Sequence, residues 1–466
     1  MIAYRAFIVR CGLNRVEQSC QDVSRLFTLS ERCFRLDREM TKKFGFWTLT
    51  FLVVANMVGA GLFTTSGFSL ADLQAPYLVI LAWAVGGVLA LSGAVGYGQL
   101  VQAIPESGGE YLFLSRAAHP ILGFIAGWVS MIAGFSGAIA LAATVFEGYV
   151  TPERLRPSWL PQGAVAISVI CLAGGMHGLR PRVGALAQNI VVILKLGLLI
   201  GILAFAAGHM PTNVSHETGN NQDALSGWAL INAFAGSLVW ISLSYAGFNA
   251  AVYVAEEVED AKRVVPRAMV MGTGVVMILY VLLNAVFVYG GPPERVIGKE
   301  DIAAIAANSL GGPRFEIFVR GTIAACLLTS VFSMMMAAPR VYAKMAEDGF
   351  LPHRLRFNGD SPRGATSVQV LIAVVLVLVS SLQGLLTYLG MTLSLSSACS
   401  VGCLFLPRMR QCSMLHPRLW MPTVFVIGTV TSAAMLGIHN PWQVIGTALT
   451  FGMGALAYVF VWRTKS

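Results

Sequence analysis

The chain has 466 residues, of which 56% are apolar and 12% charged, and its net charge is +9. The charged share is about half that of soluble domains, which excludes a disordered or ordinary water-soluble protein. A mean hydropathy of +0.69 predicts that many segments use lipid as their solvent. Because the basic residues lie between apolar runs and not on one exposed face, the charge does not indicate a nucleic-acid partner.

Residues 1–40 differ from the rest of the chain. They carry scattered arginines and three cysteines, and they lack the uninterrupted apolar core of a signal peptide. Two interpretations stay open: a dispensable cytoplasmic N-terminal extension, or the product of a start codon upstream of a native start near Met40. We assign no function to this stretch.

Twelve apolar runs follow, each of a length that can cross a bilayer and each bounded by Pro, Gly or charged residues. We predict spans at 45–69, 76–102, 119–149, 162–178, 184–208, 226–257, 267–291, 315–345, 366–382, 384–406, 419–437 and 441–462. An even number of spans places both termini on the same side. The stretch 292–314, between the seventh and eighth spans, is predicted to be a short helix that acts as a lid.

The distribution of basic residues predicts the orientation, because Lys and Arg resist translocation. Of the 32 basic residues, 25 lie on the side of the termini, six on the other side, and Lys195 alone within a span. We therefore expect a multi-pass protein of the cytoplasmic membrane with both termini in the cytoplasm.

The first and sixth predicted spans carry matching weak points at mid-depth. The first has Gly59 and Gly61 around Ala60, and the sixth has Gly247 next to the polar Asn249. These glycines could be close-packing contacts between helices, for which small residues are common in membranes. Their repetition in the first of five consecutive spans instead favours an inverted-repeat transporter whose interrupted helices line a substrate site.

Interrupted helices suit a zwitterionic substrate. Breaking a helix in hydrocarbon leaves backbone groups without partners, and this is tolerated only where they line a cavity. The N-terminal end of a half-helix offers N–H groups to a carboxylate, and a C-terminal end offers carbonyl groups to an ammonium. An amino acid has both groups.

Five motifs in this order resemble those of the amino acid, polyamine and organocation (APC) superfamily of permeases, closest to its L-type, neutral amino acid branch. They are residues 58–63 (VGAGLF), 105–111 (PESGGEY), 123–128 (GFIAGW), 245–249 (YAGFN) and 339–352 (PRVYAKMAEDGFLP). The resemblance covers residues 42–460. It implies an all-α polytopic membrane protein of the leucine-transporter type: twelve transmembrane helices, a five-plus-five inverted repeat with helices 1 and 6 broken, and two C-terminal helices. The repeats would then be 41–208 and 226–406, followed by the last two helices and a short tail at 407–466.

The resemblance also implies which residues bind the substrate. In the first span, the backbone of Val58, Gly59, Ala60 and Gly61 would face the carboxylate. In the sixth span, the carbonyl groups of Leu243, Ser244, Tyr245, Ala246 and Gly247 would face the amino group. Leu243 and Tyr245 would add an apolar gating surface. Asn249 matches the neutral branch, whereas some exchangers of cationic substrates have an acidic residue there.

Lys195 is the one basic residue within a predicted span. A charged group there is costly and by default suggests function. The resemblance implies that its ammonium replaces the cation of related sodium symporters, facing carbonyl groups of the first-span break and a hydroxyl of the eighth span, Ser330 or Ser333, and that it acts in coupling. Alternatively, the side chain extends to the cytoplasmic interface.

We therefore expect a sodium-independent secondary transporter of neutral amino acids, working by alternating access as a proton symporter or exchanger. The alternative is a polyamine or cationic amino acid transporter of the same fold, which requires an acidic residue near the site. Asn249 argues against this alternative, and Glu147 leaves it open.

An enzyme or receptor is disfavoured, since the seven His are scattered and no phosphate-binding loop occurs. We expect no metal site, no cofactor and no nucleic acid; the expected partners are an amino acid, protons and lipids. Glu106 and Glu110 are interpreted as structural or gating residues.

Overall fold

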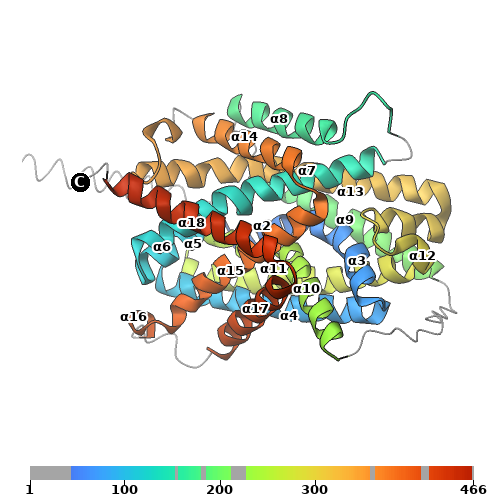
Figure 1. The fold of residues 1–466 in the computed structure, drawn as a ribbon, viewed down its shortest axis with the longest axis horizontal. Helices are drawn as coiled ribbons and strands as arrows, with labels where there is room; N and C mark the ends of the chain where they lie inside the picture. Colours follow the sequence, from blue (N-terminus) through green and yellow to red (C-terminus); the bar gives the residue numbers. More distant parts are fainter. Residues whose placement is uncertain are drawn as a thin grey trace, which may run out of the picture.

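The computed structural model describes residues 44–152, 156–179, 185–210, 227–356, 363–410 and 419–463, and these are almost entirely helical (Figure 1). The predicted extension at 1–40 therefore lies outside the described residues. Apart from one isolated bridge between Phe44 and Val258, the described part of the chain contains no strand. The all-α fold class is confirmed.

The main helices follow the predicted spans closely. They are α2 (Phe46–Met57), α3 (Ala60–Leu73), α4 (Pro76–Ala103), α6 (Pro120–Val129), α7 (Ala138–Val150), α8 (Ala164–Leu179), α9 (Ala185–His209), α10 (Gly227–Ser244), α11 (Ala261–Tyr289), α13 (Ile302–Glu347), α14 (Arg363–Val379), α15 (Leu382–Gly402), α17 (Trp420–His439) and α18 (Pro441–Arg463). Between them lie α5 (Gly109–Ala117), α12 (Pro293–Val296), α16 (Pro407–Arg410) and the irregular turns η1 (Ser130–Gly137), η3 (Ala250–Glu257), η4 (His353–Leu355) and η5 (Cys403–Phe405).

Nine described helical segments are long and apolar enough to cross a membrane, and ten when the bent pair α2–α3 counts as one span. The shorter apolar helices α8 and α14 occupy the fourth and ninth predicted runs and lie side by side at one edge of the molecule (Figure 1). The chain is thus a polytopic helical membrane protein. The total of twelve spans, and the division into two repeats, stay predictions.

The first predicted interruption is present between α2 and α3. The two helices are bent by 43° at a break of two residues. Gly59 has an extended backbone, with φ −133° and ψ −161°, and no side chain caps the helix that follows it.

The second interruption follows α10. The α-helix ends at Ser244, residues 245–249 form turns, and the chain continues as the 3₁₀ helix η3. Gly247 has a φ of +102°, a conformation that side chains disfavour. A Cβ at Gly247 would also lie 2.8 Å from the backbone carbonyl carbon of Asn56, so the turn packs directly on α2. The interruption lies at the predicted position, and the second half of this span is a 3₁₀ helix.

The third span is irregular as well. Between α6 and α7 the chain forms the π-helical turn η1, which widens the helix at mid-span. Single π-helical turns within α-helices occur frequently at functional sites. This turn contacts α15 and lies beside the two interruptions, because Ser130 and Phe135 face the same cavity as residues 243–249.

The predicted lid between the seventh and eighth spans is only partly separate from the eighth span. Ile302 begins a helix that bends at Gly312, which has a φ of +72°, and then continues to Glu347 as the eighth span. The short helix α12 precedes it. Gly298 N–H donates to Gly67 O of α3, so this segment is tied to the second half of the first span.

Candidate functional site

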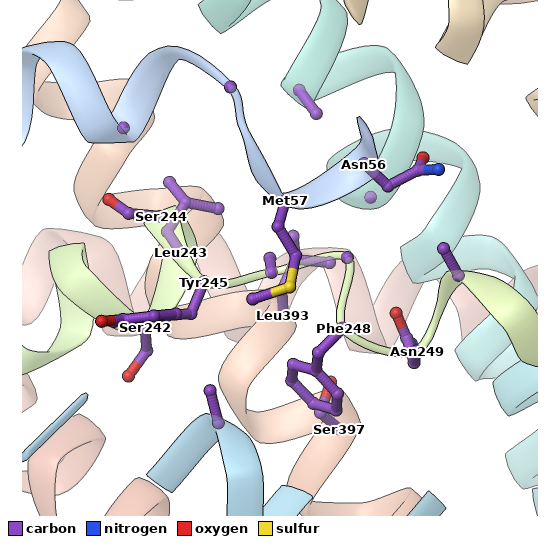
Figure 2. Close-up of a pocket in the computed structure, with 18 of the residues that line it drawn as sticks. Asn56, Met57, Ser242, Leu243, Ser244, Tyr245, Phe248, Asn249, Leu393 and Ser397 are labelled. Atoms are coloured by element: carbon purple, nitrogen blue, oxygen red, sulfur yellow. The ribbon is translucent and has the colours of Figure 1, made fainter. Parts of the chain in front are cut away.

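A cavity of 240 Å³ lies where the two interruptions meet (Figure 2). Its volume is slightly below the range of typical ligand pockets, which suits a small metabolite. Nine of the ten residues proposed to bind substrate line it: Gly59, Ala60, Gly61, Leu243, Ser244, Tyr245, Ala246, Gly247 and Asn249. The tenth, Val58, does not line it. Figure 2 shows the stretch from Tyr245 to Asn249 running beside Met57 and past Leu393 and Ser397 of α15.

The first interruption supplies hydrogen-bond donors. The N–H groups at the start of a helix have no partners within that helix. At α3 these groups begin at Ala60, the preceding Gly59 provides no side-chain cap, and both residues line the cavity. The partial positive charge of a helix N-terminus favours an anion here.

The second interruption supplies acceptors. Within the turn, Leu243 O accepts from Ala246 N–H, and Gly247 O accepts from Ala250 N–H. Ser244 O accepts from the hydroxyl of Tyr280. The remaining carbonyl groups of this stretch, those of Tyr245 and Ala246, are therefore the acceptors left for a ligand.

Tyr280 of α11 connects the two interruptions. Its hydroxyl lies 2.5 Å from Met57 O and 3.1 Å from Ser244 O, so a single proton is shared between the ends of α2 and α10. The ring is fully buried. Four residues later, Asn284 accepts a hydrogen bond from Ser66 of α3 at 2.5 Å. One face of α11 thus holds both halves of the first span and the end of α10.

The halves of the first and sixth spans also touch each other closely. A Cβ at Gly61 would lie 2.2 Å from Ser244 Oγ and 2.9 Å from Ser244 Cα. The Ser244 hydroxyl lies 3.1 Å from the hydroxyl of Thr65. Gly61 is therefore required for packing between α3 and α10 in addition to lining the cavity.

The Lys195 side chain of α9 is 6% exposed and reaches the back of the first interruption. Its Nζ donates to Val58 O at 2.5 Å, to Ser330 Oγ at 3.1 Å and to Cys326 O at 3.4 Å. Ser330 Oγ also lies 3.2 Å from Val58 O. Ser330, and not Ser333, is thus the hydroxyl in contact with Lys195. The lysine points inward, and an extended path to the cytoplasmic interface is excluded.

Tyr245 lines the cavity with its backbone, while its ring packs elsewhere. The hydroxyl donates to Trp83 O of α4 at 3.0 Å, and the ring contacts those of Trp83 and Tyr280. The side chain is 1% exposed. Leu243 therefore remains the better candidate for an apolar gating surface.

Two acidic residues that the sequence drew attention to have different surroundings. Glu147 lies outside the cavity, where it accepts hydrogen bonds from Arg156 at 2.7 Å, from Gly163 N–H at 2.9 Å and from Ala166 N–H at 3.0 Å. Glu110, in contrast, lines the cavity and is 5% exposed. Among the described lining residues it is the one carboxylic acid, and none is Lys, Arg or His.

The carboxyl of Glu110 is held by neutral groups. Tyr97 donates to Oε1 at 2.5 Å, Ser397 to Oε1 at 3.1 Å, Ser396 to Oε2 at 3.2 Å, and the amide of Asn249 to Oε1 at 3.4 Å. Burial raises the pKa of Glu110, while the hydrogen bonds from Tyr97, Ser397 and Ser396 hold it down.

Sequence reasoning missed Tyr280, the serine pair at 396–397 and the cavity position of Glu110. A usable signal existed for α11, where Tyr280 and Asn284 are four residues apart in an apolar span and so share one face. No group of three or more His, Cys, Asp or Glu that could hold a metal occurs among the described residues.

Comparison with known proteins agrees with this geometry. Residues 44–443 match the model of the family described as amino acid permease. The chain is similar to the cystine/glutamate transporter of Homo sapiens, with 24% identity over 89% of this chain and 84% of the relative. It is also similar to the Asc-type amino acid transporter 1 of Homo sapiens (22% identity, 91% and 84%) and to the large neutral amino acids transporter small subunit 2 of Mus musculus (24% identity, 75% and 67%).

Proposed function

This chain belongs to the amino acid permease family of the APC superfamily, and we propose that it is a sodium-independent transporter of neutral amino acids that works by alternating access. Family membership makes it an amino acid transporter of the membrane and not an enzyme. The choice of neutral substrates, the independence of sodium and the mode of coupling, proton symport or exchange, are the proposal.

The observation that carries the proposal is the meeting of opposite helix ends around one small cavity. The N–H groups from Ala60 onward would bind the substrate carboxylate, and the carbonyl groups of Tyr245 and Ala246 would bind its ammonium. These contacts recognise the carboxylate and ammonium groups that all α-amino acids share. The other residues that line the cavity then determine which substrate side chains fit.

A neutral side chain fits that wall best. Met57, Leu141 and Leu393 give it apolar surface, and the described lining contains no basic residue to pair with an acidic substrate. Leu243 is proposed to close over the side chain. The name of one relative, the large neutral amino acids transporter small subunit 2, is consistent with this choice.

The position of Lys195 supports independence of sodium. Its ammonium contacts two backbone carbonyl groups and the Ser330 hydroxyl, which are oxygen ligands of the kind that a sodium ion would need. A fixed positive charge at this point would repel a metal cation and stabilise the end of α2. We propose that Lys195 and Ser330 act together there.

One observation favours the second candidate, a transporter of polyamines or cationic amino acids. Glu110 is a carboxyl in the cavity wall, where it could pair with a cationic side chain. Against this, neutral donors already surround it. Glu147 gives no support, since it is paired with Arg156 outside the cavity.

We also propose that the protein lies in the cytoplasmic membrane, surrounded by lipid, with both termini in the cytoplasm. The excess of basic residues on the side of the termini supports this orientation. It places α5 and Glu110 toward the cytoplasmic end of the cavity.

A thermal-shift screen tests the substrate class. A ligand that binds the folded state raises its apparent melting temperature in proportion to the logarithm of its concentration over Kd. We expect neutral amino acids to stabilise the purified protein in sodium-free buffer, and polyamines, lysine and arginine not to. Stabilisation by cations alone would favour the second candidate, and an absolute need for sodium would contradict the role of Lys195.

A further inference from the structure

Glu110 differs from the other buried carboxyl groups of the described chain in having no cationic partner. Glu147 is paired with Arg156 at 2.7 Å, and Glu316 with Arg320 at 2.8 Å. The groups that hydrogen-bond to Glu110 are all neutral: the hydroxyls of Tyr97, Ser130, Ser396 and Ser397 and the amide of Asn249. A buried carboxylate without a counter-charge is close in free energy to its protonated form.

The hydroxyl groups around Glu110 can serve both protonation states. Tyr97, Ser396 and Ser397 can each donate to a carboxylate, and each can turn its proton away to accept from a carboxylic acid. The heavy atoms need not move for this exchange. Arg156 and Arg320 can only donate hydrogen bonds, so the surroundings of Glu147 and Glu316 lack this second option.

The same carboxyl is connected to the substrate site. Asn249, whose amide donates to Glu110 Oε1, is the last residue of the interrupted stretch of the sixth span, and both residues line the cavity. Figure 2 shows Asn249 farther along the same stretch as Ser244 and Tyr245, with Ser397 below this stretch. A hydrogen bond to an ionised acceptor is roughly twice as strong as a neutral one. Proton binding at Glu110 would therefore loosen the sixth span from α5 and α15.

We propose that Glu110 is the proton-binding site of the transport cycle, taking up one proton from water on one side of the membrane and returning it to water on the other side with each substrate carried. This inference rests on the proposed transport function and specifies proton symport. It assigns the moving proton to Glu110 and leaves to Lys195 its contacts with Val58 O and Ser330 at the first interruption.

The titratable groups that face Glu110 are few. They are Tyr97 of α4, Tyr253 of η3 and Cys399 of α15, each of which interacts electrostatically with it. Cys403 lies one helical turn beyond Cys399 in η5. The adjoining α6 and η1 contain no titratable side chain. None of these groups is a carboxyl or a base, so Glu110 is the one carboxyl of this cluster.

The direct test measures protons and substrate together. Wild-type protein in liposomes that contain a fluorescent pH indicator should acidify the lumen when a transported amino acid is added outside, at about one proton per substrate. Glu110→Gln, which keeps the shape of the side chain and removes its titration, should reduce this ratio to zero and flatten the pH profile of uptake.

The matched control is Glu106→Gln. Glu106 lies four residues earlier, in the loop before α5, is 45% exposed and pairs with Arg116 at 3.3 Å. This variant should keep the ratio and the pH profile of the wild type. A proton-to-substrate ratio that persists in Glu110→Gln overturns the proposal.

A second measurement does not depend on the rate of transport. Calorimetric titration of the purified protein with substrate, in buffers of different ionisation enthalpy, counts the protons bound with it. Tyr97→Phe removes a donor that stabilises the carboxylate, so the pKa of Glu110 rises and the midpoint of proton uptake moves to higher pH. An unchanged midpoint, or a proton count that Glu110→Gln leaves intact, overturns the proposal.

The outcomes separate this inference from the function on which it rests. If the wild type exchanges amino acids but moves no protons, proton binding at Glu110 is wrong and the transport function stands. If Glu110→Gln changes which substrates are bound and keeps the proton ratio, Glu110 is a subsite for a cationic side chain and the proposal fails. If no amino acid is bound or moved by the wild type, the proposed function itself fails.

Discussion

At the scale of single residues, two glycines with the same apparent role have different surroundings. Gly59 has an extended backbone, and a Cβ added there would lie 3.8 Å from its nearest neighbour, Met57 O. Gly247 has a φ of +102°, and its Cβ would lie 2.8 Å from the backbone of Asn56. The first glycine leaves open space at the cavity wall, whereas the second is required by the fold.

We therefore predict a separation of binding from stability. Gly59→Ala should leave the melting temperature almost unchanged and weaken substrate binding at least tenfold, because its methyl group enters the space proposed for the carboxylate. Gly247→Ala should destabilise the protein by roughly 1–3 kcal/mol through backbone strain. Thermal unfolding and substrate titration of both variants check this. Normal binding by Gly59→Ala would contradict the assignment of the carboxylate to α3.

Lys195 offers a second test at the scale of a residue. Lys195→Met leaves Val58 O with one partner, Ser330, and should abolish uptake in proteoliposomes. Ser330→Ala should reduce uptake, since it removes the hydroxyl that contacts both Lys195 Nζ and Val58 O. Ser333→Ala is the matched control, because the Ser333 hydroxyl makes no contact with Lys195. Wild-type uptake by Lys195→Met would contradict the proposed role.

How far the site could be predicted is clear from these residues. Interruptions at 58–59 and 245–249 follow from small and polar residues placed in apolar runs. The isolation of Lys195 in a span indicates a functional role, whereas its contact with the first interruption is implied by the resemblance to the permease superfamily. Glu110 could not be placed in the same way. Its loop sequence gives no indication that α5 packs against α15, which brings Ser396 and Ser397 to its carboxyl. The ring of Tyr245 also needed the structure, since its direction depends on Trp83.

At the scale of elements, the junction between α7 and α8 depends on one buried carboxylate. Glu147 accepts hydrogen bonds from Arg156 and from two N–H groups at the start of α8, and its side chain is 3% exposed. It therefore caps a helix as well as pairing with a charge. This explains why an acidic residue near the C-terminal end of the third span lies outside the substrate cavity.

Glu147→Gln should be strongly destabilising, since it removes a buried carboxylate and leaves the partly buried Arg156 without its counter-charge. Breaking such a pair costs roughly 3–5 kcal/mol. Asp260→Asn is the control, because Asp260 is 52% exposed and lies 3.8 Å from Arg263; the loss there should be below about 1 kcal/mol. Thermal unfolding measures both, and equal effects of the two variants would contradict the structural role of Glu147.

At the scale of the whole molecule, the pattern of apolar runs predicted the helical segments well. Their order and approximate bounds correspond to the described helices, including the short α8 and α14. Hydropathy could not show that the third span contains a π-helical turn, because its residues are as apolar as those of a regular helix. Nor could it show that the sixth span continues as a 3₁₀ turn, which depends on packing between Gly247 and Asn56.

The orientation of the molecule is a prediction at the same scale. Single cysteines introduced in the loop at 292–301 should react with a membrane-impermeant thiol reagent from outside intact cells, and cysteines introduced at 105–108 should not. These positions lie at opposite ends of spans in the predicted topology. Labelling at 105–108 in intact cells would reverse the orientation and place Glu110 at the outer end of the cavity.

The central claim is that neutral amino acids are carried through the cavity between the two interruptions. Exchange in proteoliposomes tests it most directly: vesicles loaded with an unlabelled amino acid are given the radiolabelled form in sodium-free buffer, across neutral, acidic and basic amino acids and polyamines. We predict accumulation of neutral amino acids by the wild type and none by Gly59→Leu, whose side chain would fill the site. Accumulation of polyamines or basic amino acids alone, or undiminished exchange by Gly59→Leu, would contradict the account.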